Sequence, residues 1–333
     1  MRTTRFRAGL GLVLATTITL TACSSDKKTD GSATTKGTGD STETTQDKGP
    51  KPGITLVQNS WTASAIEVEI AKQLIEKQLG NKVTITALDE NKQFAGLASG
   101  KLDATLELWP SGVDEKEQKY LDDKSVADMG PLGAVGQIGW YVPDYVLEKF
   151  PAVKTWEGLK DAKTAKAFAT AETGDKGRFL GTDPSYSQDD EKIIKNLNLP
   201  FEAKFSGSEP ATVSELARAV AAKEPVLMYW WTPTAAVAKY NLKAVELPAY
   251  DPNSRKDPAK VNCAYPADPL KKIASAKLEA KDAAVWKFIQ KFQLTNDQQL
   301  ALLPLVEIDK KDAKEVAAKW IADNESIWKA WFE

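Results

Sequence analysis

The sequence predicts an α/β protein with two lobes, and three observations lead to that expectation. Short apolar runs alternate with helical patterns, about 280 residues follow residue 53, and an extended Gly-rich run at 131–142 separates two alternating regions. Strands that alternate with helices form parallel βαβ units in an open sheet. A chain of this length suffices for two α/β lobes or for one large domain.

The first alternating region supplies the first predicted strands. Its helix begins near Ser60 or Thr62, either of which could cap it, because Ile66, Ile70 and Leu74 recur at four-residue spacing. The predicted elements here are a strand at 54–58, that helix, a strand at 83–88, a short helix at 94–99 ended by Gly100, and a strand at 104–109 stopped by Pro110.

The second region follows the run 131–142, which we interpret as an extended connector between the lobes. Its predicted elements are a helical stretch at 155–168, a short strand at 169–171, a turn-rich loop at 181–187, a helix at 188–197 and a buried strand at 225–231. A long irregular loop at 249–269 and helices at 283–292, 296–303 and 312–332 then complete the body. We expect the first lobe to comprise 54–134 and 245–333, and the second lobe 135–244.

The last predicted helix carries tryptophans on one face. Trp320, Trp328 and Trp331 are eight and three residues apart, and we expect them, like Trp286, to pack in the core. They are therefore not candidates for binding a ligand.

The first residues indicate the compartment. A basic start is followed by an apolar stretch at 8–20, too short to span a bilayer, which is typical of a signal peptide. The run LTAC at 20–23 resembles a bacterial lipobox, so we expect a leader at 1–22 and lipidation of Cys23, with an ordinary signal peptide and a chance cysteine as the alternative. Residues 23–53 have a Ser/Thr/Gly/Asp/Lys composition that cannot bury a core, and we interpret them as a disordered tether with a reach of roughly 30 Å. The predicted location is the extracytoplasmic face of the cell membrane.

Composition excludes several classes of function. The chain has 44 basic and 46 acidic residues and shows no basic patch, so a nucleic-acid partner is not expected. It has no histidine, which removes Ser-His-Asp and Cys-His catalysis and every zinc site built on imidazole. If Cys23 is acylated, Cys263 is the one remaining thiol, and we expect it to be packed and inert. We expect neither a cofactor nor a metal.

Three aromatic residues mark a candidate site. Trp109, Tyr186 and Trp231 each close an apolar run and open a turn, and ligands of open α/β sheets bind outside the carboxyl ends of strands. A quaternary ammonium has no N–H to donate, but ring faces can hold it at about 0.5–2 kcal/mol each. Trp61 and Trp140 are candidates of second rank. The alternative is that all these rings are core residues that plug strand ends.

Five sequence runs resemble a known family. They are VQNSWTAS at 57–64, the run LDENKQFAGLASGKLDATLELWPSG at 88–112, GPLGAVGQIGWYVP at 130–143, GTDPSYS at 181–187 and MYWWTPTA at 228–235. In this order they resemble the glycine betaine/proline betaine substrate-binding proteins of ABC importers. The resemblance covers residues 54–333 and implies a two-lobed periplasmic-binding-protein fold (type II-like), with a ligand cleft between lobes joined by a hinge. It also implies a receptor that hands its ligand to an ABC permease and catalyses no reaction; we expect a monomer.

The resemblance also assigns roles to individual residues. It places Trp109 and Trp231 at cage tryptophans and Tyr186 where relatives usually have tryptophan. It implies that the backbone N–H groups of Ser187 and Gln188 grip the ligand carboxylate, which suits the free N–H groups at a helix start. Relatives often carry a second cysteine upstream of the position of Cys263; here that cysteine, and so the disulfide, is absent.

Alternative functions remain open at this point. Choline, carnitine or another quaternary amine could be the ligand, with Asp183 in place of the anion site at Ser187 and Gln188. An enzyme with paired carboxylates is weakly supported, because the adjacent acids at 189–192 would not face each other across a substrate. A sensory or adhesive lipoprotein that has lost transport is a third possibility. Glu107 and Asp183 lie near the cage in sequence and are not ranked as ligand contacts.

Overall fold

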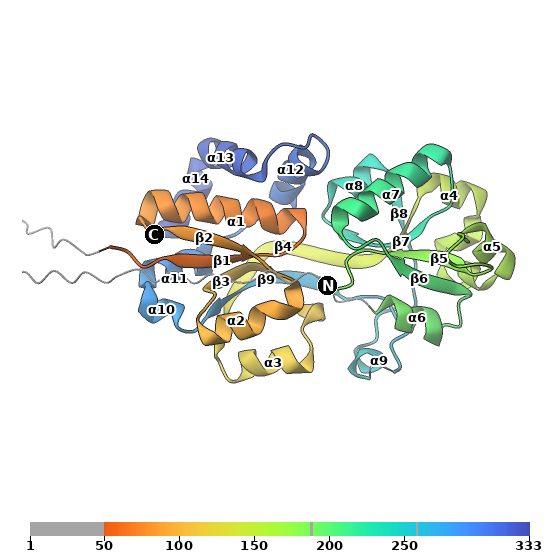
Figure 1. Cartoon of the computed structure of the whole chain (residues 1–333), viewed down its shortest axis with the longest axis horizontal. Coiled ribbons are helices and arrows are strands. Elements are labelled where there is room, and N and C mark those ends of the chain that lie inside the picture. Colours follow the sequence, from red (N-terminus) through yellow and green to blue (C-terminus); the bar gives the residue numbers. More distant parts are fainter. Residues whose placement is uncertain (1–49, 187–188, 258) are drawn as a thin grey trace, which may run out of the picture. The chain divides into compact units, whose positions relative to one another are not determined.

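The computed structural model describes residues 50–186, 189–257 and 259–333. Their core is one mixed sheet of nine strands in the order β2-β1-β3-β9-β4-β7-β5-β6, with β8 paired to β4 (Figure 1). The strands are β1 Ile54–Gln58, β2 Val83–Ala87, β3 Ala104–Leu108, β4 Val126–Pro143, β5 Gly177–Gly181, β6 Phe201–Phe205, β7 Leu227–Thr232, β8 Leu242–Val245 and β9 Ala267–Ser275.

Strand direction divides the sheet into two parallel groups. Strand β1 pairs in parallel with β2 and β3, and β5 pairs in parallel with β6 and β7. Between these groups β4 and β9 run antiparallel to each other, and each also pairs antiparallel with a neighbouring strand. The predicted parallel βαβ units are therefore confirmed within each group, but the sheet that joins them is mixed.

Several predicted boundaries are wrong at the centre of this sheet. The run 131–142 is extended, as predicted, but it belongs to the 18-residue strand β4 and is no free connector. The predicted irregular loop at 249–269 contains a helix, Pro252–Lys256, and its last residues already belong to β9. Residues 169–171 form no strand: Ala169 makes a single bridge to Gly177, at the start of β5. Long-range pairing, which local patterns do not report, decides these segments.

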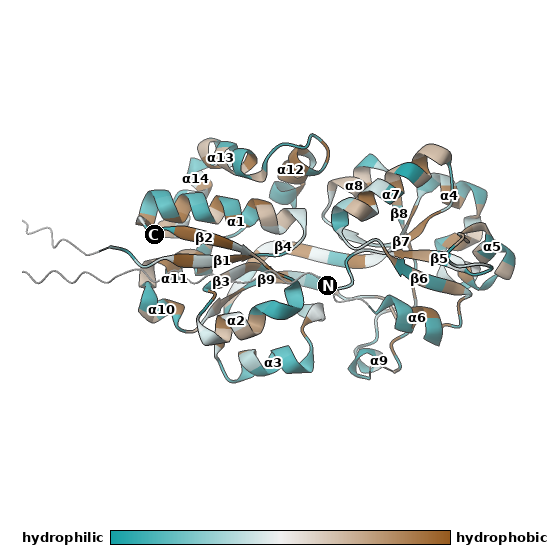
Figure 2. Cartoon of the chain, viewed as in Figure 1, coloured by the Kyte–Doolittle hydropathy of each residue, from teal (hydrophilic) through white to brown (hydrophobic). Residues whose placement is uncertain are grey.

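Helices pack against both faces of the sheet (Figure 1). They are α1 Thr62–Leu74, α2 Gln93–Ser99, α3 Glu115–Asp122, α4 Asp144–Lys149, α5 Ala162–Ala167, α6 Asp190–Asn196, α7 Glu209–Ala222, α8 Ala235–Lys239, α9 Pro252–Lys256, α10 Leu278–Lys281, α11 Ala283–Lys291, α12 Asn296–Glu307, α13 Ala313–Asp323 and α14 Glu325–Trp328. Hydrophobic residues gather on strands such as β1 and β2, while outer helices such as α3 carry hydrophilic residues (Figure 2). This distribution places the core on the sheet faces beneath the helices.

The helix predicted at 312–332 is interrupted at Asn324, where α13 ends, and continues as α14 and a 3-10 turn. Even so, Trp320, Trp328 and Trp331 are buried as predicted. The Trp328 indole Nε1–H donates a hydrogen bond to the Ile321 carbonyl at 2.8 Å. Trp286 is partly buried against the same core.

Two parts of the prediction stay predictions. The leader at 1–22, Cys23 and the tether up to residue 49 lie outside the described residues. The lobe boundaries at 134/135 and 244/245 stay a prediction. Within the part of the chain that the structure describes, no helix is both long and apolar enough to cross a membrane.

Candidate functional site

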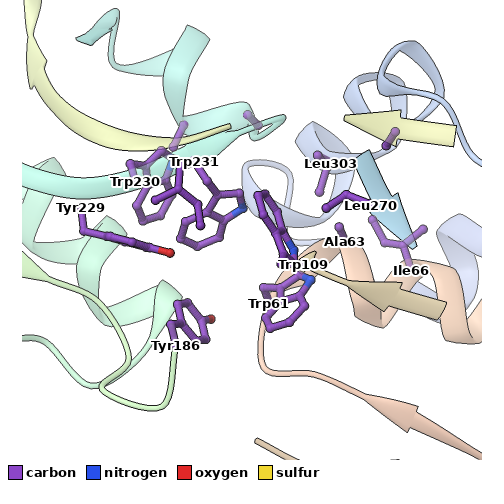
Figure 3. Packing of buried hydrophobic residues seen from close by; sticks show 14 of the residues in the cluster. Trp61, Ala63, Ile66, Trp109, Tyr186, Tyr229, Trp230, Trp231, Leu270 and Leu303 are labelled. Carbon is purple, nitrogen blue, oxygen red and sulfur yellow. The ribbon is translucent and has the colours of Figure 1, made fainter. Parts of the chain in front are cut away.

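A cavity that is partly open to solvent lies where the three predicted aromatic residues meet. Figure 3 shows Trp61 and Trp109 on one side of it, and Tyr186, Tyr229 and Trp231 on the other. The lining residues are Trp61, Glu90, Trp109, Gly112, Ile138, Tyr186, Tyr229 and Trp231. The structure thus brings Trp109, Tyr186, Trp231 and the second-rank candidate Trp61 together around one space.

Trp61 and Trp109 are placed by the ends of β3 and α1. Trp61 has an extended backbone directly before α1, and Trp109 directly follows β3. The Trp109 indole Nε1–H donates a hydrogen bond to Glu107 Oε1 at 2.9 Å. Gly136 on β4 leaves room for this ring, because a Cβ there would lie 2.2 Å from Trp109 Cζ3. The orientation of Trp109 is therefore fixed both by a hydrogen bond and by a missing side chain.

Tyr229 and Trp231 reach the cavity from the same strand. They are two residues apart on β7, so their side chains share one face of the sheet. The Trp231 ring stacks on Trp230 with centroids 4.4 Å apart and an interplanar angle of 28°. The Tyr229 ring meets the edge of Tyr265 at 6.2 Å. The Trp231 and Tyr229 rings are therefore supported by neighbouring aromatic rings, whereas the Trp109 ring is supported by the carboxyl group of Glu107.

Tyr186 closes the aromatic wall. Its ring lies edge-on to Trp61 at 5.6 Å and 84° and to Trp231 at 5.8 Å and 82°, a geometry that aromatic pairs favour. The Ser60 hydroxyl lies 3.3 Å from the Tyr186 hydroxyl and donates to it. Burial raises the pKa of Tyr186 far above its ordinary value, so this side chain stays a neutral phenol at physiological pH. The cavity thus combines ring faces and ring edges.

Acidic groups dominate the electrostatics of the cavity. Glu90 lines it and is 9% exposed. Behind the tryptophans, burial raises the pKa of Glu107 to about 7. Burial also raises the pKa of Glu209 to about 7, although this carboxyl accepts a 2.9 Å hydrogen bond from the Thr62 backbone N–H. Among the described residues that line the cavity there is no lysine or arginine.

This arrangement suits a methylated cation. Ring faces attract such a cation through their quadrupoles, and nearby carboxylates add a favourable potential. The described residues contain no group of three or more His, Cys, Asp or Glu that could hold a metal ion. The geometry supports binding by shape and charge.

One predicted candidate, Trp140, does not line this cavity, and two others lie outside the described residues. Trp140 is fully buried and does not line it: its ring packs on Phe179 at 4.7 Å, and its Nε1–H donates to Asp190 Oδ1 at 2.6 Å. Asp190 is the first residue of α6, so Trp140 anchors that helix and the expected ligand contact is not supported. Ser187 and Gln188 lie outside the described residues.

Sequence reasoning missed several lining residues. Tyr229 carried a usable signal, because a residue two positions before Trp231 on a strand shares its face. Glu90 lies just beyond the carboxyl end of β2, an edge where ligands bind in such sheets. Ile138 lies in the run 131–142 that predicts a connector, Gly112 follows the predicted strand end at Pro110, and neither residue type signals binding by itself.

An aromatic cavity carried by a mixed α/β sheet defines a small-molecule binding protein. Comparison with known families makes this more specific: residues 52–323 match the substrate binding domain of the ABC-type glycine betaine transport system. The chain therefore belongs to that family. It is the extracytoplasmic substrate-binding component of an importer for quaternary ammonium compounds and is not an enzyme.

The individual proteins that this chain resembles share a quarter or less of its sequence, or only slightly more. The chain is 26% identical over 284 residues to a trimethylamine N-oxide-binding protein from Pelagibacter ubique, covering 84% of this chain and 90% of that protein. Lactococcal OpuAC in its closed conformation with glycine betaine matches with a TM-score of 0.69 at 21% identity, over 85% of this chain and all of that one. An ABC-transporter choline binding protein in complex with choline matches with a TM-score of 0.69 at 17% identity, over 84% of this chain and 91% of that chain. At these identities the two solved structures establish the two-lobed binding-protein fold.

Proposed function

We propose that the chain captures glycine betaine in the aromatic cavity and delivers it to an ABC permease. The observation that carries the proposal is the convergence of Trp61, Trp109, Tyr186, Tyr229 and Trp231 on one space. Glycine betaine has a trimethylated nitrogen, which offers protein groups no N–H and is best held by ring faces. Lobe closure over the ligand, implied by the family resemblance, would be the state that the permease recognises.

The expected affinity follows from additive contributions. Each well-placed ring adds about 1 kcal/mol, and each buried methyl group about 0.8 kcal/mol. Charge-assisted hydrogen bonds to the carboxylate, which the resemblance assigns to the backbone of Ser187 and Gln188, add roughly 1.5–3 kcal/mol each. After association costs, the total is near the −8 kcal/mol of micromolar binding.

Titration of intrinsic tryptophan fluorescence tests this function. We expect glycine betaine to change the emission of the full-length protein saturably, with a dissociation constant in the micromolar range, because several cavity rings are indoles. Proline betaine, choline, carnitine and trimethylamine N-oxide form the comparison panel, and glycine serves as the unmethylated control. Absence of saturable binding by every methylated compound would contradict the proposal.

A ligand without a carboxylate is the second candidate, and Glu90 favours it. A carboxylate in the cavity wall repels the anionic end of a betaine, but attracts a simple cation such as choline. The relative from Pelagibacter ubique is named for trimethylamine N-oxide, whose anionic end is a single oxygen. Glu90→Gln separates the candidates: it should weaken choline binding and leave glycine betaine binding equal or tighter. A loss of both would indicate that Glu90 shapes the wall and does not select by charge.

We further propose that the protein is a monomer anchored to the membrane through a lipid on Cys23. The lipobox-like run LTAC at 20–23 supports the anchor. In cells, Cys23→Ala should abolish fatty-acid labelling and move the protein from the membrane fraction to the soluble fraction. Light scattering of the purified protein at micromolar concentration should give the mass of one chain, and a dimer mass would contradict that part.

A further inference from the structure

Two buried carboxyl groups lie behind the tryptophan side of the cavity. Glu67 is on α1 and Glu107 is on β3, and each is 1% exposed. One oxygen of each has a protein donor: Gln299 Nε2–H donates to Glu67 Oε1 at 2.7 Å, and Trp109 Nε1–H donates to Glu107 Oε1 at 2.9 Å. Glu107 is thus hydrogen-bonded to a ring that lines the cavity, and Glu67 is hydrogen-bonded to a residue of α12.

The other oxygen of each carboxyl, Glu67 Oε2 and Glu107 Oε2, is buried and has no hydrogen-bond partner among the described residues. A buried oxygen without a donor is costly when the carboxyl is charged, and the cost falls when the carboxyl is protonated.

The surroundings affect the two carboxyls differently. Burial and then the charge of Glu107 raise the pKa of Glu67 well above its ordinary value. Burial also raises the pKa of Glu107, to about 7, while the Trp109 indole N–H that donates to it favours its carboxylate form. Glu107 is therefore the carboxyl whose charge can change near neutral pH beside the Trp109 ring.

On the basis of the proposed function, we propose that Glu107 is a positioning residue of the cavity. Its carboxylate accepts the Trp109 indole N–H, which fixes the ring, and supplies the negative charge that strengthens the hold of this ring on a quaternary ammonium. Glu107 does not line the cavity, so it acts through Trp109. A carboxylate on the N–H edge of an indole increases the electron density of the ring face, and its charge also acts directly on a cation beyond the ring.

Other charged groups face the pair from neighbouring elements. The charge of Glu209 on α7 raises the pKa of Glu107, and Lys272 on β9 lowers that of Glu67. The Lys272 ammonium is held by the carbonyls of Gln290 and Phe292, the former at 2.8 Å. Glu209 titrates near the same pH as Glu107, so a test must distinguish these two acids.

The test measures choline affinity between pH 5.5 and 8.5 by calorimetry on the full-length protein. Choline keeps its positive charge throughout, so any pH dependence comes from the protein. We expect the wild-type affinity to fall by about tenfold as pH drops through the pKa of Glu107, the size expected of a partly screened charge near a cation. Glycine betaine, measured in parallel, reports whether the cavity binds a zwitterion as well.

Three isosteric variants assign the effect. Glu107→Gln keeps an acceptor for Trp109 but removes the charge, so choline affinity at pH 8 should fall about tenfold and the pH step should disappear. Glu67→Gln removes the other buried acid and leaves the hydrogen bond between Glu107 and Trp109 in place, so choline affinity at pH 8 should stay near wild type and a pH step should remain. Glu209→Gln should retain the step, which separates the second acid from the first.

Each result discriminates. Unchanged affinity and an unchanged pH step in Glu107→Gln would overturn the proposal, and so would a pH step lost only in Glu209→Gln. A purely structural role would lower the melting temperature of the Glu107 and Glu67 variants alike and leave the pH step in place. A wild-type protein that binds neither choline nor glycine betaine would contradict the proposed function itself, whereas wild-type binding without a pH step overturns the role of the acid pair alone.

Discussion

Two groups of aromatic rings in this molecule have similar composition and different surroundings. The cavity group comprises Trp61, Trp109, Tyr186, Tyr229 and Trp231, which lie around one open space. The C-terminal cluster comprises Phe288, Phe292, Trp320, Trp331 and Phe332, whose rings contact one another directly. Its centroid distances include 4.8 Å for Phe292–Trp331, 4.9 Å for Phe288–Phe332 and 5.8 Å for the stacked pair Trp320–Trp331.

The difference lies in what holds each ring from behind. A ring of the C-terminal cluster is fixed by neighbours on several sides. A ring that faces open space must be fixed on its other sides, and in the cavity group Glu107 and Gly136 do this for Trp109 while Trp230 does it for Trp231. Rings that border the cavity are thus distinguished from core rings by the groups that fix them on the side away from the cavity.

The largest expected effect is on stability, in the C-terminal cluster. Trp331→Ala removes a buried ring that contacts Phe288, Phe292 and Trp320. We expect the free energy of unfolding to fall by about 3–5 kcal/mol, as for other large aromatic deletions in cores. Denaturant unfolding measures this loss. Calorimetry below the melting temperature should show unchanged ligand affinity, and a weakened affinity would mean that the two groups are coupled.

Trp231→Ala should show the opposite pattern. Loss of this ring removes one wall of the cavity, and we expect affinity for the preferred ligand to fall at least about 100-fold. The loss of stability should be smaller than for Trp331→Ala, because one face of the ring borders the cavity. Trp231→Phe keeps an aromatic face and should recover part of the affinity. Equal losses of stability in the two alanine variants would show that Trp231 is an ordinary core residue.

Much of this contrast was predictable from the chain. Trp109 and Trp231 each end a short apolar run directly before a Pro-containing turn, which predicts a strand end at the ligand-binding edge. Trp320, Trp328 and Trp331 recur at helical spacing, which predicts a core face, and the structure confirms their burial. In these cases local sequence pattern and tertiary position agree.

Other features depend on contacts that local sequence does not report. Strand β9 contains Pro269, Lys271 and Lys272, and its first residues fall in the irregular loop predicted at 249–269. Lys272 is nevertheless fully buried, because the carbonyls of Gln290 and Phe292, distant in sequence, accept its N–H groups. The acid pair behind the cavity was unpredictable for the same reason, since Glu67 lies on a helix and Glu107 on a strand 40 positions later.

A glycine comparison tests the support of Trp109 directly. A Cβ at Gly136 would lie 2.2 Å from Trp109 Cζ3, whereas a Cβ at Gly139 on the same strand would make an ordinary 3.4 Å contact with Tyr141. Gly136→Ala should therefore displace the indole, lower stability by about 1–3 kcal/mol, and weaken ligand binding about tenfold. Gly139→Ala is the matched control and should change neither quantity by much. Similar effects of both substitutions would mean that β4 tolerates no side chain in this stretch for reasons unrelated to Trp109.

The smallest expected effect concerns a buried acid between α12 and α8. Glu307, at the end of α12, accepts a 2.9 Å hydrogen bond from the Ala235 backbone N–H at the start of α8. Burial, and then the charge of Glu209, raise its pKa from 4.5 to about 8. The folded state therefore binds this proton more tightly than the unfolded state. The resulting stabilisation is complete below about pH 4.5 and is lost as pH rises towards 8.

Glu307→Gln should reveal that loss, because glutamine keeps an acceptor for Ala235 and never ionises. At pH 8.5 we expect the melting temperature of the variant to exceed that of the wild type by about 2–4 °C, since the wild-type carboxylate is buried and charged there. At pH 5 the two proteins should melt together, because Glu307 is then protonated. A variant that is less stable at both pH values would show that the glutamate side chain, through its hydrogen bond to the start of α8, contributes more to stability than its burial costs.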